Sequence, residues 1–285
     1  MERDTLYAAL DSYLAALTKR DARAVRWTDS PLTSENNVML DRDDGLWGTI
    51  EGIGEYRLLF ADPKTNQVGY FGTVHEHMEE SAYALRLKFD DAGRIEEAEA
   101  LVVRQSDSGI KFENPRYWDK PILNTHPEKP DTRDEMIRLS NGYFDTLQLN
   151  DGTIHTKFHP DCNRVENGVQ TTRNPDFAKI VPVSALGCEE QFRMGNYRYD
   201  DRLRARRYPL VDEERGLVLA YGFIDHSGRL AEYQLTDGRT VQSPVRRPHS
   251  FYIAELFKID DGMISQIEAN FITVPYNMPS PWDAR

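Results

Sequence analysis

Apolar residues recur at intervals of three and four in two stretches of the chain, one at its start and one near its middle. This period matches one face of an α-helix, so a helix is predicted in each stretch. Segments with two-residue alternation follow each helix and predict β-strands, with DDAG and DDG as the tight turns of the last hairpins. A helix followed by antiparallel strands is typical of an α+β domain. The apolar helical positions are Leu6, Leu10, Tyr13, Leu14 and Leu17, then Met136, Leu139, Tyr143, Phe144 and Leu147.

The two halves of the chain match one another segment by segment. ERDTLYAALDSYL corresponds to TRDEMIRLSNGYF, and QVGYFGTVHE corresponds to LVLAYGFIDH. The final hairpins, YALRLKFDDAGRIEEAEALVVR and IAELFKIDDGMISQIEANFITV, also match. Matches in the same order indicate a tandem duplication. We therefore expect one domain over residues 1–108, a second over 131–285, and a linker rich in Pro, Asn, Asp and Gly over 109–130.

Composition refines this picture mainly by exclusion. The 285 residues are 39% hydrophobic and 29% charged, which fits globular domains, and the net charge of −12 disfavours nucleic-acid binding. No apolar run approaches about 18 residues and the N-terminus lacks the pattern of a signal peptide. We therefore expect a cytoplasmic protein without membrane contact. Cys162 and Cys188 form no metal or redox motif, and both are expected to be reduced packing residues.

The order of helix, connector, strand and a long hairpin ending in FKIDDGMISQIEA resembles the SnoaL-like branch of the nuclear-transport-factor-2-like superfamily. This resemblance covers both halves. It implies two tandem cone-shaped α+β barrels of the cystatin-like kind, each with N-terminal helices, a curved antiparallel sheet and a deep pocket at the open end. The stretches TSENNVML, HPDCNRVENGVQTT and VPYNMPSPW further resemble a two-copy subgroup similar to the cofactor-free γ-formaldehyde lyases of lignin-derived diarylpropane diols.

Alternation brings reactive side chains onto one face of the first strand in each half. Arg164 and Glu166 share a face in NRVENG, and Glu35 has the matching position in the first half. If that face lines the cone, desolvation raises the pKa of each carboxyl toward the range of a general base. The alternative is an exposed or capping acid.

The last strand of each half carries a second carboxylate, Glu99 or Glu268. Cone-fold enzymes often place an acid or base on this strand, so both are expected to face the cone across from the first-strand acids. A solvent-facing sheet surface is the alternative. The helix tyrosines Tyr13 and Tyr143 have the place of an oxyanion-stabilising phenol, with core packing as the alternative role.

The remaining candidates lie on segments whose role is more open. GIGEYRLLF is interpreted as a helix near the mouth of the first cone, where Tyr56 and Arg57 bind a phenol or a carboxylate, or form salt bridges. Arg104 follows the last strand of the first half and is expected to hold an anionic oxygen, with a surface cation at the domain interface as the alternative. His159 is a catalytic candidate, and no metal-ligand cluster surrounds it. The other substrate-binding candidates are Tyr70 and His226.

Motifs that cradle nucleotide phosphates or present a serine nucleophile are absent, and we expect neither a cofactor nor a metal. The resemblance and these residues predict a lyase that dehydrates an aromatic diol to a quinone methide and releases formaldehyde to give a stilbene. The alternatives are a non-catalytic binding or assembly module, and an isomerase, cyclase or dehydratase of polyketide- or steroid-like compounds. The expected partner is an aromatic small molecule, and the expected assembly is a homo-oligomer.

Overall fold

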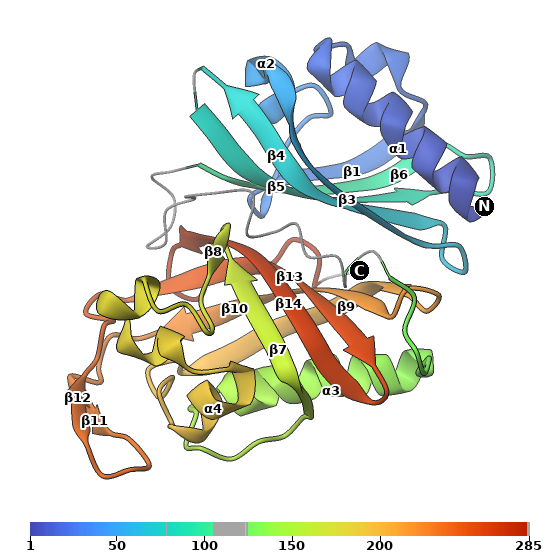
Figure 1. Cartoon of the computed structure of the whole chain (residues 1–285). Helices are drawn as coiled ribbons and strands as arrows, with labels where there is room; N and C mark the ends of the chain where they lie inside the picture. Colours follow the sequence, from blue (N-terminus) through green and yellow to red (C-terminus); the bar gives the residue numbers. More distant parts are fainter. Residues whose placement is uncertain (78, 105–122, 124, 284–285) are drawn as a thin grey trace.

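The first half of the chain folds as a helix followed by a six-stranded sheet of order β2-β1-β6-β5-β4-β3 (Figure 1). The computed structural model describes residues 1–77, 79–104, 123 and 125–283. The elements of this half are α1 (Arg3–Thr18), η1 (Ala22–Ala24), β1 (Trp27–Glu35), β2 (Val38–Met39), α2 (Leu46–Thr49), β3 (Gly52–Asp62), β4 (Gln67–Glu76), β5 (Glu79–Phe89) and β6 (Ile95–Val103).

The second half repeats this arrangement with a sheet of order β8-β7-β14-β13-β10-β9. Its additional elements lie between β8 and β9 and between β10 and β13. The elements are α3 (Arg133–Leu147), β7 (Phe158–Glu166), β8 (Val169–Gln170), η4 (Phe177–Lys179), η5 (Pro182–Ala185), α4 (Cys188–Arg193), β9 (Arg202–Asp212), β10 (Leu217–His226), β11 (Glu232–Gln234), β12 (Thr240–Gln242), β13 (His249–Asp260) and β14 (Met263–Val274).

These two sheets confirm the α+β class and the internal repeat. Each sheet is mixed and not purely antiparallel, because β1 pairs in parallel with β6 and β7 pairs in parallel with β14. In each half the long helix packs on the inner face of its sheet, with a separate buried apolar core between helix and sheet. The predicted linker, residues 109–130, falls mainly on residues outside the described ones, and the proposed domain boundaries remain a prediction.

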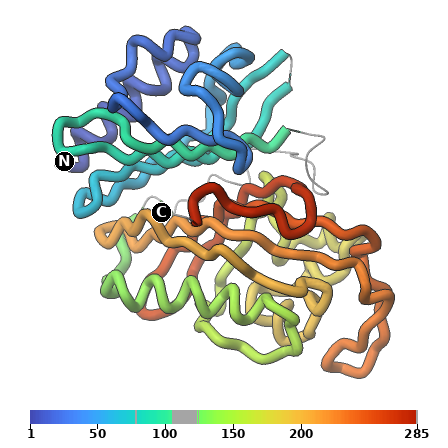
Figure 2. Tube along the Cα trace, turned by 180° about the vertical axis from the view of Figure 1, so that it is seen from behind, coloured from blue at the N-terminus to red at the C-terminus, as the bar shows by residue number. Residues whose placement is uncertain are grey.

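The outer faces of the two sheets pack against each other, and the long helices lie on the far sides of this double layer (Figures 1 and 2). A third apolar core fills the space between the sheets. It contains Leu58, Phe60 and Phe71 from the first sheet, and Leu219, Tyr221 and Tyr252 from the second. Burial of this much apolar side chain makes the two halves one packed body.

Reciprocal ion pairs join the two halves at corresponding positions. Arg3 at the start of α1 binds Asp212 at the end of β9, with an N–O distance of 2.7 Å. Arg133 at the start of α3 binds Asp62 at the end of β3, at 2.6 Å. Each of these aspartates also accepts a backbone N–H from the other half, Asp212 from Ala61 and Asp62 from Val211. The two halves are therefore related by approximate two-fold symmetry, like the subunits of a symmetric dimer.

Two expectations from the sequence need correction. Tyr56 and Arg57 lie on β3, not on a helix, because GIGEYRLLFAD alternates as an edge strand of the first sheet. Cys162 on β7 and Cys188 at the start of α4 form a disulfide with a Cα–Cα distance of 5.8 Å. This bond contradicts the expectation that both cysteines are reduced packing residues.

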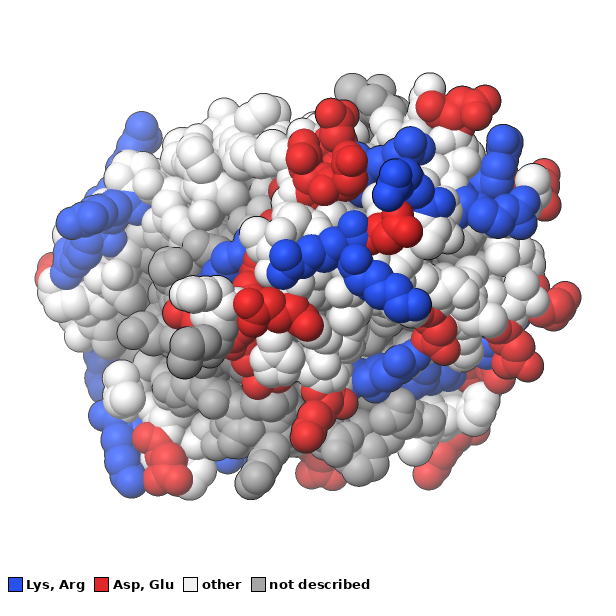
Figure 3. Space-filling model, turned by 90° about the horizontal axis from the view of Figure 1, so that it is seen from above, with Lys and Arg blue, Asp and Glu red and all other residues white. Residues whose placement is uncertain are grey.

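The surface carries charges of both signs. In the view from above, basic and acidic side chains are interspersed over the visible face and do not gather into regions of one sign (Figure 3). Within the described part of the chain, no helix combines the length and the apolar character needed to cross a membrane.

Candidate functional site

The inner face of β13 carries a buried carboxyl group that points into the second cone. Ile253 and Phe257 belong to the core between α3 and the second sheet, and Glu255 alternates with them on that face. Only 3% of Glu255 is exposed. Sequence reasoning missed this residue, although a single acid among the apolar residues of FYIAELF is the signal that identifies it.

The carboxyl group of Glu255 has a raised pKa, which favours its protonated form at neutral pH. Burial raises the pKa of its carboxyl to about 8, and the nearby charge of Glu166 acts in the same direction. Arg164 and a hydrogen bond with Tyr143 oppose this rise. Burial also raises the pKa of the Tyr143 phenol well above its usual value. A protonated Glu255 carboxyl group and a neutral Tyr143 phenol can each donate a proton or a hydrogen bond. Two such groups in an apolar surrounding suit general acid catalysis.

Arg164 on β7 provides the positive charge of the same cone and is 2% exposed. Its guanidinium lies 3.3 Å from the Glu166 carboxylate and 3.5 Å from the Tyr143 hydroxyl. It also donates to Gln191 Oε1 at 2.6 Å and to the Tyr197 hydroxyl at 2.5 Å. A buried cation with this many partners is held in one position.

Glu166 is a partly exposed carboxylate near the buried Glu255. Its side chain is 22% exposed, and it follows Arg164 by two residues on the inner face of β7. Its charge acts on Glu255 and also on Asp200, which places all three carboxyl groups in one electrostatic network. The sequence prediction that Arg164 and Glu166 share a face toward the cone agrees with this geometry.

His226 lies at the end of β10, buried beside a carboxyl group that sequence reasoning did not identify. Its Nε2 is 2.9 Å from Asp200 Oδ1, and its ring stacks on His249 with centroids 4.5 Å apart. Burial raises the pKa of Asp200, while His226 opposes that rise. Burial lowers the pKa of His249. The second half therefore carries a second buried acid–base pair, packed against Phe251.

Aromatic rings surround these polar groups. Tyr143 meets Phe192 and Phe257 edge to face, with centroids 5.3 and 5.1 Å apart. Phe251 packs on Phe271 at 4.7 Å. These rings pack on one another in the core of the second half and lower the local dielectric constant, which strengthens the charge interactions beside them.

The first cone has the same helix tyrosine but different chemistry. Tyr13 is buried against Trp27 and Trp47. At the positions equivalent to Arg164 and Glu255, the strand registers place Thr33 and Leu85. A cavity of about 30 Å³ lies beside Tyr13 and Glu35, which is space for roughly one water molecule.

Glu35 is part of an ion network at the mouth of the first cone. It accepts the backbone N–H of Leu46 at 2.6 Å and binds Arg104 at 3.0 Å. Arg104 also binds Glu76 at 2.8 Å. A second, more open cavity of about 320 Å³ is lined by Arg104, Glu76, Arg20 and Thr49. The structure thus brings Glu35 and Arg104 together, with both engaged in structural contacts.

Glu99 and Glu268 do not face either cone. Both lie on the outer faces of their sheets, because Ala98 and Ala269 take the inward positions next to them. Glu99 is buried between the sheets, where it binds Arg86 at 3.0 Å, Arg207, and the Tyr252 hydroxyl at 2.6 Å. Glu268 accepts the Tyr56 hydroxyl at 2.9 Å across the domain boundary. The expected pairing of these acids with Glu35 and Glu166 across one cone is wrong.

The other candidates are dispersed. Tyr70 lies buried in the first core beside Tyr83, and burial raises its pKa to about 12. Arg57 pairs with Asp11 on α1 at the surface. His159 is 42% exposed and accepts the backbone N–H of Asp161. Among the described residues, no group of three His, Cys, Asp or Glu side chains has the geometry of a metal site.

A helix packed in a curved six-stranded sheet, with polar groups on the inner face, defines a cone-shaped α+β domain, and this domain is present twice in the chain. The chain belongs to the family described as Domain of unknown function (DUF8021), whose model matches residues 129–271. No curated protein matches the chain.

Several solved structures are similar to part of the chain. One is a protein of unknown function with a cystatin-like fold from Methylobium petroleophilum, at 16% identity over 39% of this chain and 83% of that chain, with a TM-score of 0.32. Another is an NTF-2 like protein from Burkholderia xenovorans, at 12% identity over 36% and 86%, with a TM-score of 0.30. A steroid delta-isomerase from Pseudomonas aeruginosa matches at 17% identity over 37% and 84%, with a TM-score of 0.28. These likenesses concern the fold.

Proposed function

We propose that the chain is a cofactor-independent acid–base enzyme, a lyase of an aromatic diol, with its active site in the second cone. The observation that carries the proposal is Glu255, a carboxyl group with a pKa of about 8 that lies beside Tyr143 and Arg164. Burying a carboxyl group is unfavourable, and perturbed groups of this kind cluster at functional sites.

The buried acid fits the first step of a dehydration. Glu255 donates its proton to the benzylic hydroxyl, the C–O bond breaks, and water leaves. The electron pair of a para-hydroxyl group on the ring then forms a quinone methide. Its phenolic proton passes to a neighbouring base, for which His226, held by Asp200, is the candidate. Each positioned proton transfer contributes on the order of 10²–10⁴ in rate.

The second step needs a base for the terminal hydroxyl. Glu166 takes that proton, the carbon–carbon bond to the hydroxymethyl carbon breaks, and formaldehyde leaves. The released electron pair returns to the quinone methide, which becomes a stilbene and recovers its phenolic proton. The overall products are one stilbene, one water and one formaldehyde for each diol. The substrate is itself the electron sink, so the step requires no redox partner.

A dehydratase or isomerase is the second candidate, because Glu255 and the Asp200–His226 pair also suit proton shuttling without carbon–carbon cleavage. To separate the two, the purified chain is incubated with a diarylpropane diol bearing a para-hydroxyl group. A lyase gives stilbene and formaldehyde in equal amounts. Water loss without formaldehyde favours the dehydratase, and binding without any product favours a non-catalytic module.

Glu166→Gln is expected to lower turnover by about 10² or more, because the amide keeps the shape of the side chain but accepts no proton. The matched control is Glu35→Gln, the equivalent position of the first domain, which is expected to keep turnover within about twofold. Steady-state kinetics of both variants, with thermal unfolding as the check on folding, measures the difference. A larger loss for Glu35→Gln would transfer the active site to the first cone.

A further inference from the structure

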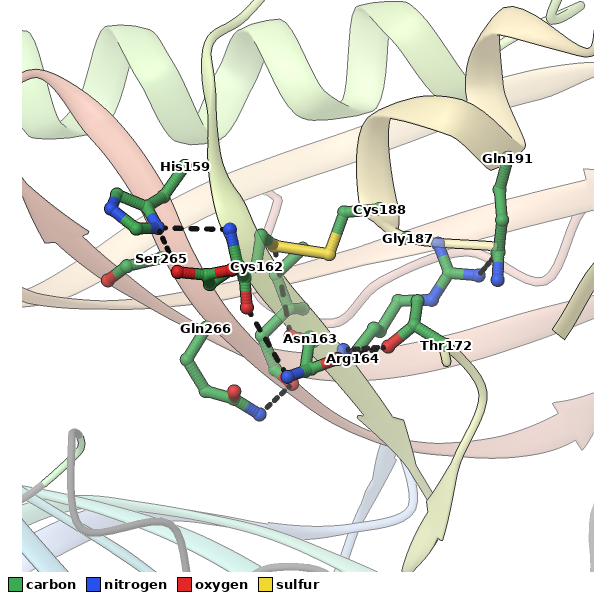
Figure 4. Close-up of a disulfide and its surroundings, with 12 residues drawn as sticks. His159, Cys162, Asn163, Arg164, Thr172, Gly187, Cys188, Gln191, Ser265 and Gln266 are labelled. Atoms are coloured by element: carbon green, nitrogen blue, oxygen red, sulfur yellow. Dashed lines mark hydrogen bonds and ion pairs between the residues drawn. A yellow bond between two sulfur atoms is a disulfide. The ribbon is translucent and has the colours of Figure 1, made fainter. Parts of the chain in front are cut away.

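The disulfide lies beside the buried charges of the second cone. Cys162 is two residues before Arg164 on the inner face of β7, and Cys188 begins α4 (Figure 4). Three residues further along α4, Gln191 accepts a hydrogen bond from Arg164. The disulfide and the Gln191–Arg164 contact therefore join the same two elements side by side.

The segment between β8 and β9, residues 171–201, holds the Arg164 side chain from several sides. Thr171, Gln191 and Tyr197 all belong to this segment and all hydrogen-bond to the guanidinium. The ring of Phe192 also lies under it, with the guanidinium carbon 5.6 Å from the ring centroid. Nothing on β7 itself replaces these partners except Glu166. The position of Arg164 thus depends on where this segment lies.

The first part of this segment, residues 173–183, contains no buried residue. Residues 177–179 contain no buried side chain, and Ile180 is 78% exposed. Segments with few buried apolar contacts open locally at low cost in free energy. The covalent link at Cys188, which closes a loop with a sequence separation of 26, restricts this opening.

The first domain has no such device. Its connection between β2 and β3, residues 40–51, is shorter, and Pro31 takes the position that corresponds to Cys162. That domain also carries Thr33 where the second carries Arg164. The disulfide and the buried arginine therefore occur together, in the half that holds Glu255.

We propose that the Cys162–Cys188 disulfide is a redox control point of the second cone: it keeps residues 171–201 closed on Arg164, with Gln191 as the positioning residue. A dithiol reductant supplies two electrons and two protons. The S–S bond breaks, two thiols form, and the reductant becomes a disulfide. Both sulfurs are buried, so the reductant reaches them only when the segment opens. The role in catalysis rests on the proposed function, whereas control of Arg164 does not.

The test compares the oxidised chain with the chain reduced by dithiothreitol under native conditions. Hydrogen exchange of the Arg164 Nε–H, followed by NMR, reports on the guanidinium, and backbone exchange is measured over residues 188–193. Reduction is expected to speed both by tenfold or more while the amides of β10 and β13 keep their rates. Unchanged Arg164 exchange would overturn the proposal, as would a uniform increase over the whole second domain.

Two variants separate the disulfide from the hydrogen bonds that it supports. Gln191→Leu with the disulfide intact is expected to speed Arg164 Nε–H exchange while the backbone of β7 stays protected. Cys162→Ser/Cys188→Ser is expected to behave as the reduced chain does, without further response to dithiothreitol. If Gln191→Leu leaves Arg164 exchange unchanged, Gln191 is not the positioning residue. If the oxidised chain turns over the diol, reduction is expected to lower kcat at least tenfold. If the chain does not turn over the diol, the proposed function fails, and the exchange experiment still tests the control of Arg164.

Discussion

Replacing Glu255 by leucine is expected to abolish turnover and to stabilise the chain at neutral pH. Leucine is the residue that the first domain carries at this position, so the inner face of the sheet accommodates it. The variant removes the buried acid of the proposed reaction, and the expected loss in kcat is about 10² or more. Active-site groups commonly lower the free energy of unfolding of the protein that carries them.

The effect on stability depends on pH with a definite sign. In the unfolded chain the carboxyl has a pKa near its usual 4.5, and in the folded chain about 8. Below about pH 4.5 both states are protonated and Glu255 costs nothing. As the pH rises toward 8, the unfolded state ionises while the folded state does not, so stability falls by roughly 1.4 kcal/mol per pH unit. By pH 7 the penalty is on the order of 3 kcal/mol.

Urea unfolding of the wild type, Glu255→Leu and Glu255→Gln at pH 5, 7 and 8 measures this difference. Both variants are expected to lose the decline in stability between pH 5 and 8 that Glu255 imposes. Glu255→Leu is expected to gain roughly 1–3 kcal/mol over the wild type at pH 7, since the hydrogen bond with Tyr143 is lost at the same time. A pH dependence identical to that of the wild type would mean that the carboxyl group is ionised in the fold, and full turnover by either variant would exclude it as the acid.

The second large effect is expected between the sheets. Glu99→Gln is expected to destabilise the chain by about 3 kcal/mol, because it removes the carboxylate that the buried Arg86 and the partly exposed Arg207 share, while Arg86 keeps the Glu97 carboxylate. Arg86 is 2% exposed, and Arg207 reaches Glu99 from the other domain. Trp282 lies over both arginines and covers them from water.

Glu96→Gln on the same strand is the matched control, since Glu96 pairs only at the surface with Lys88, and its expected effect is within about 0.5 kcal/mol. Chemical denaturation of both variants measures the contrast, and circular dichroism verifies that each is folded. If Glu99→Gln costs less than about 1 kcal/mol, the charges between the sheets are not buried in solution.

The fold was accessible from the sequence because its signals are local and repeated. The helical period around Tyr13 and Tyr143 and the paired final hairpins are each visible within a short window, and the duplication doubles every signal. The helix predicted over GIGEYRLLF is wrong because this stretch places apolar residues at both two- and three-residue spacing, and only its pairing with β4 selects the strand β3.

The candidate site was harder to predict from the sequence than the fold. The alternation of side chains along a strand defines two faces but does not show which face lies inside the cone. Glu99 and Glu268 were assigned to the inner face, yet a second sheet covers the outer face, so polar residues there are buried too. Glu255 was not predicted for the same reason, because its apolar neighbours in FYIAELF do not show which face of the strand lies inside. The disulfide joins residues 26 apart, and no sequence motif indicates that they meet.

The reciprocal pairs Arg3–Asp212 and Arg133–Asp62 have a consequence for how such a chain can change. In an assembly of two identical subunits, every substitution occurs twice, once in each active site. Joining two copies in one polypeptide removes that constraint, because each copy can then change separately. The first half carries Thr33 and Leu85 at the positions of Arg164 and Glu255, and its sheet packs against the sheet of the second half. Under the proposed function, the first half must keep only the shape and the ion pairs that hold the second half in place, and the residues of the reaction are needed once in the chain.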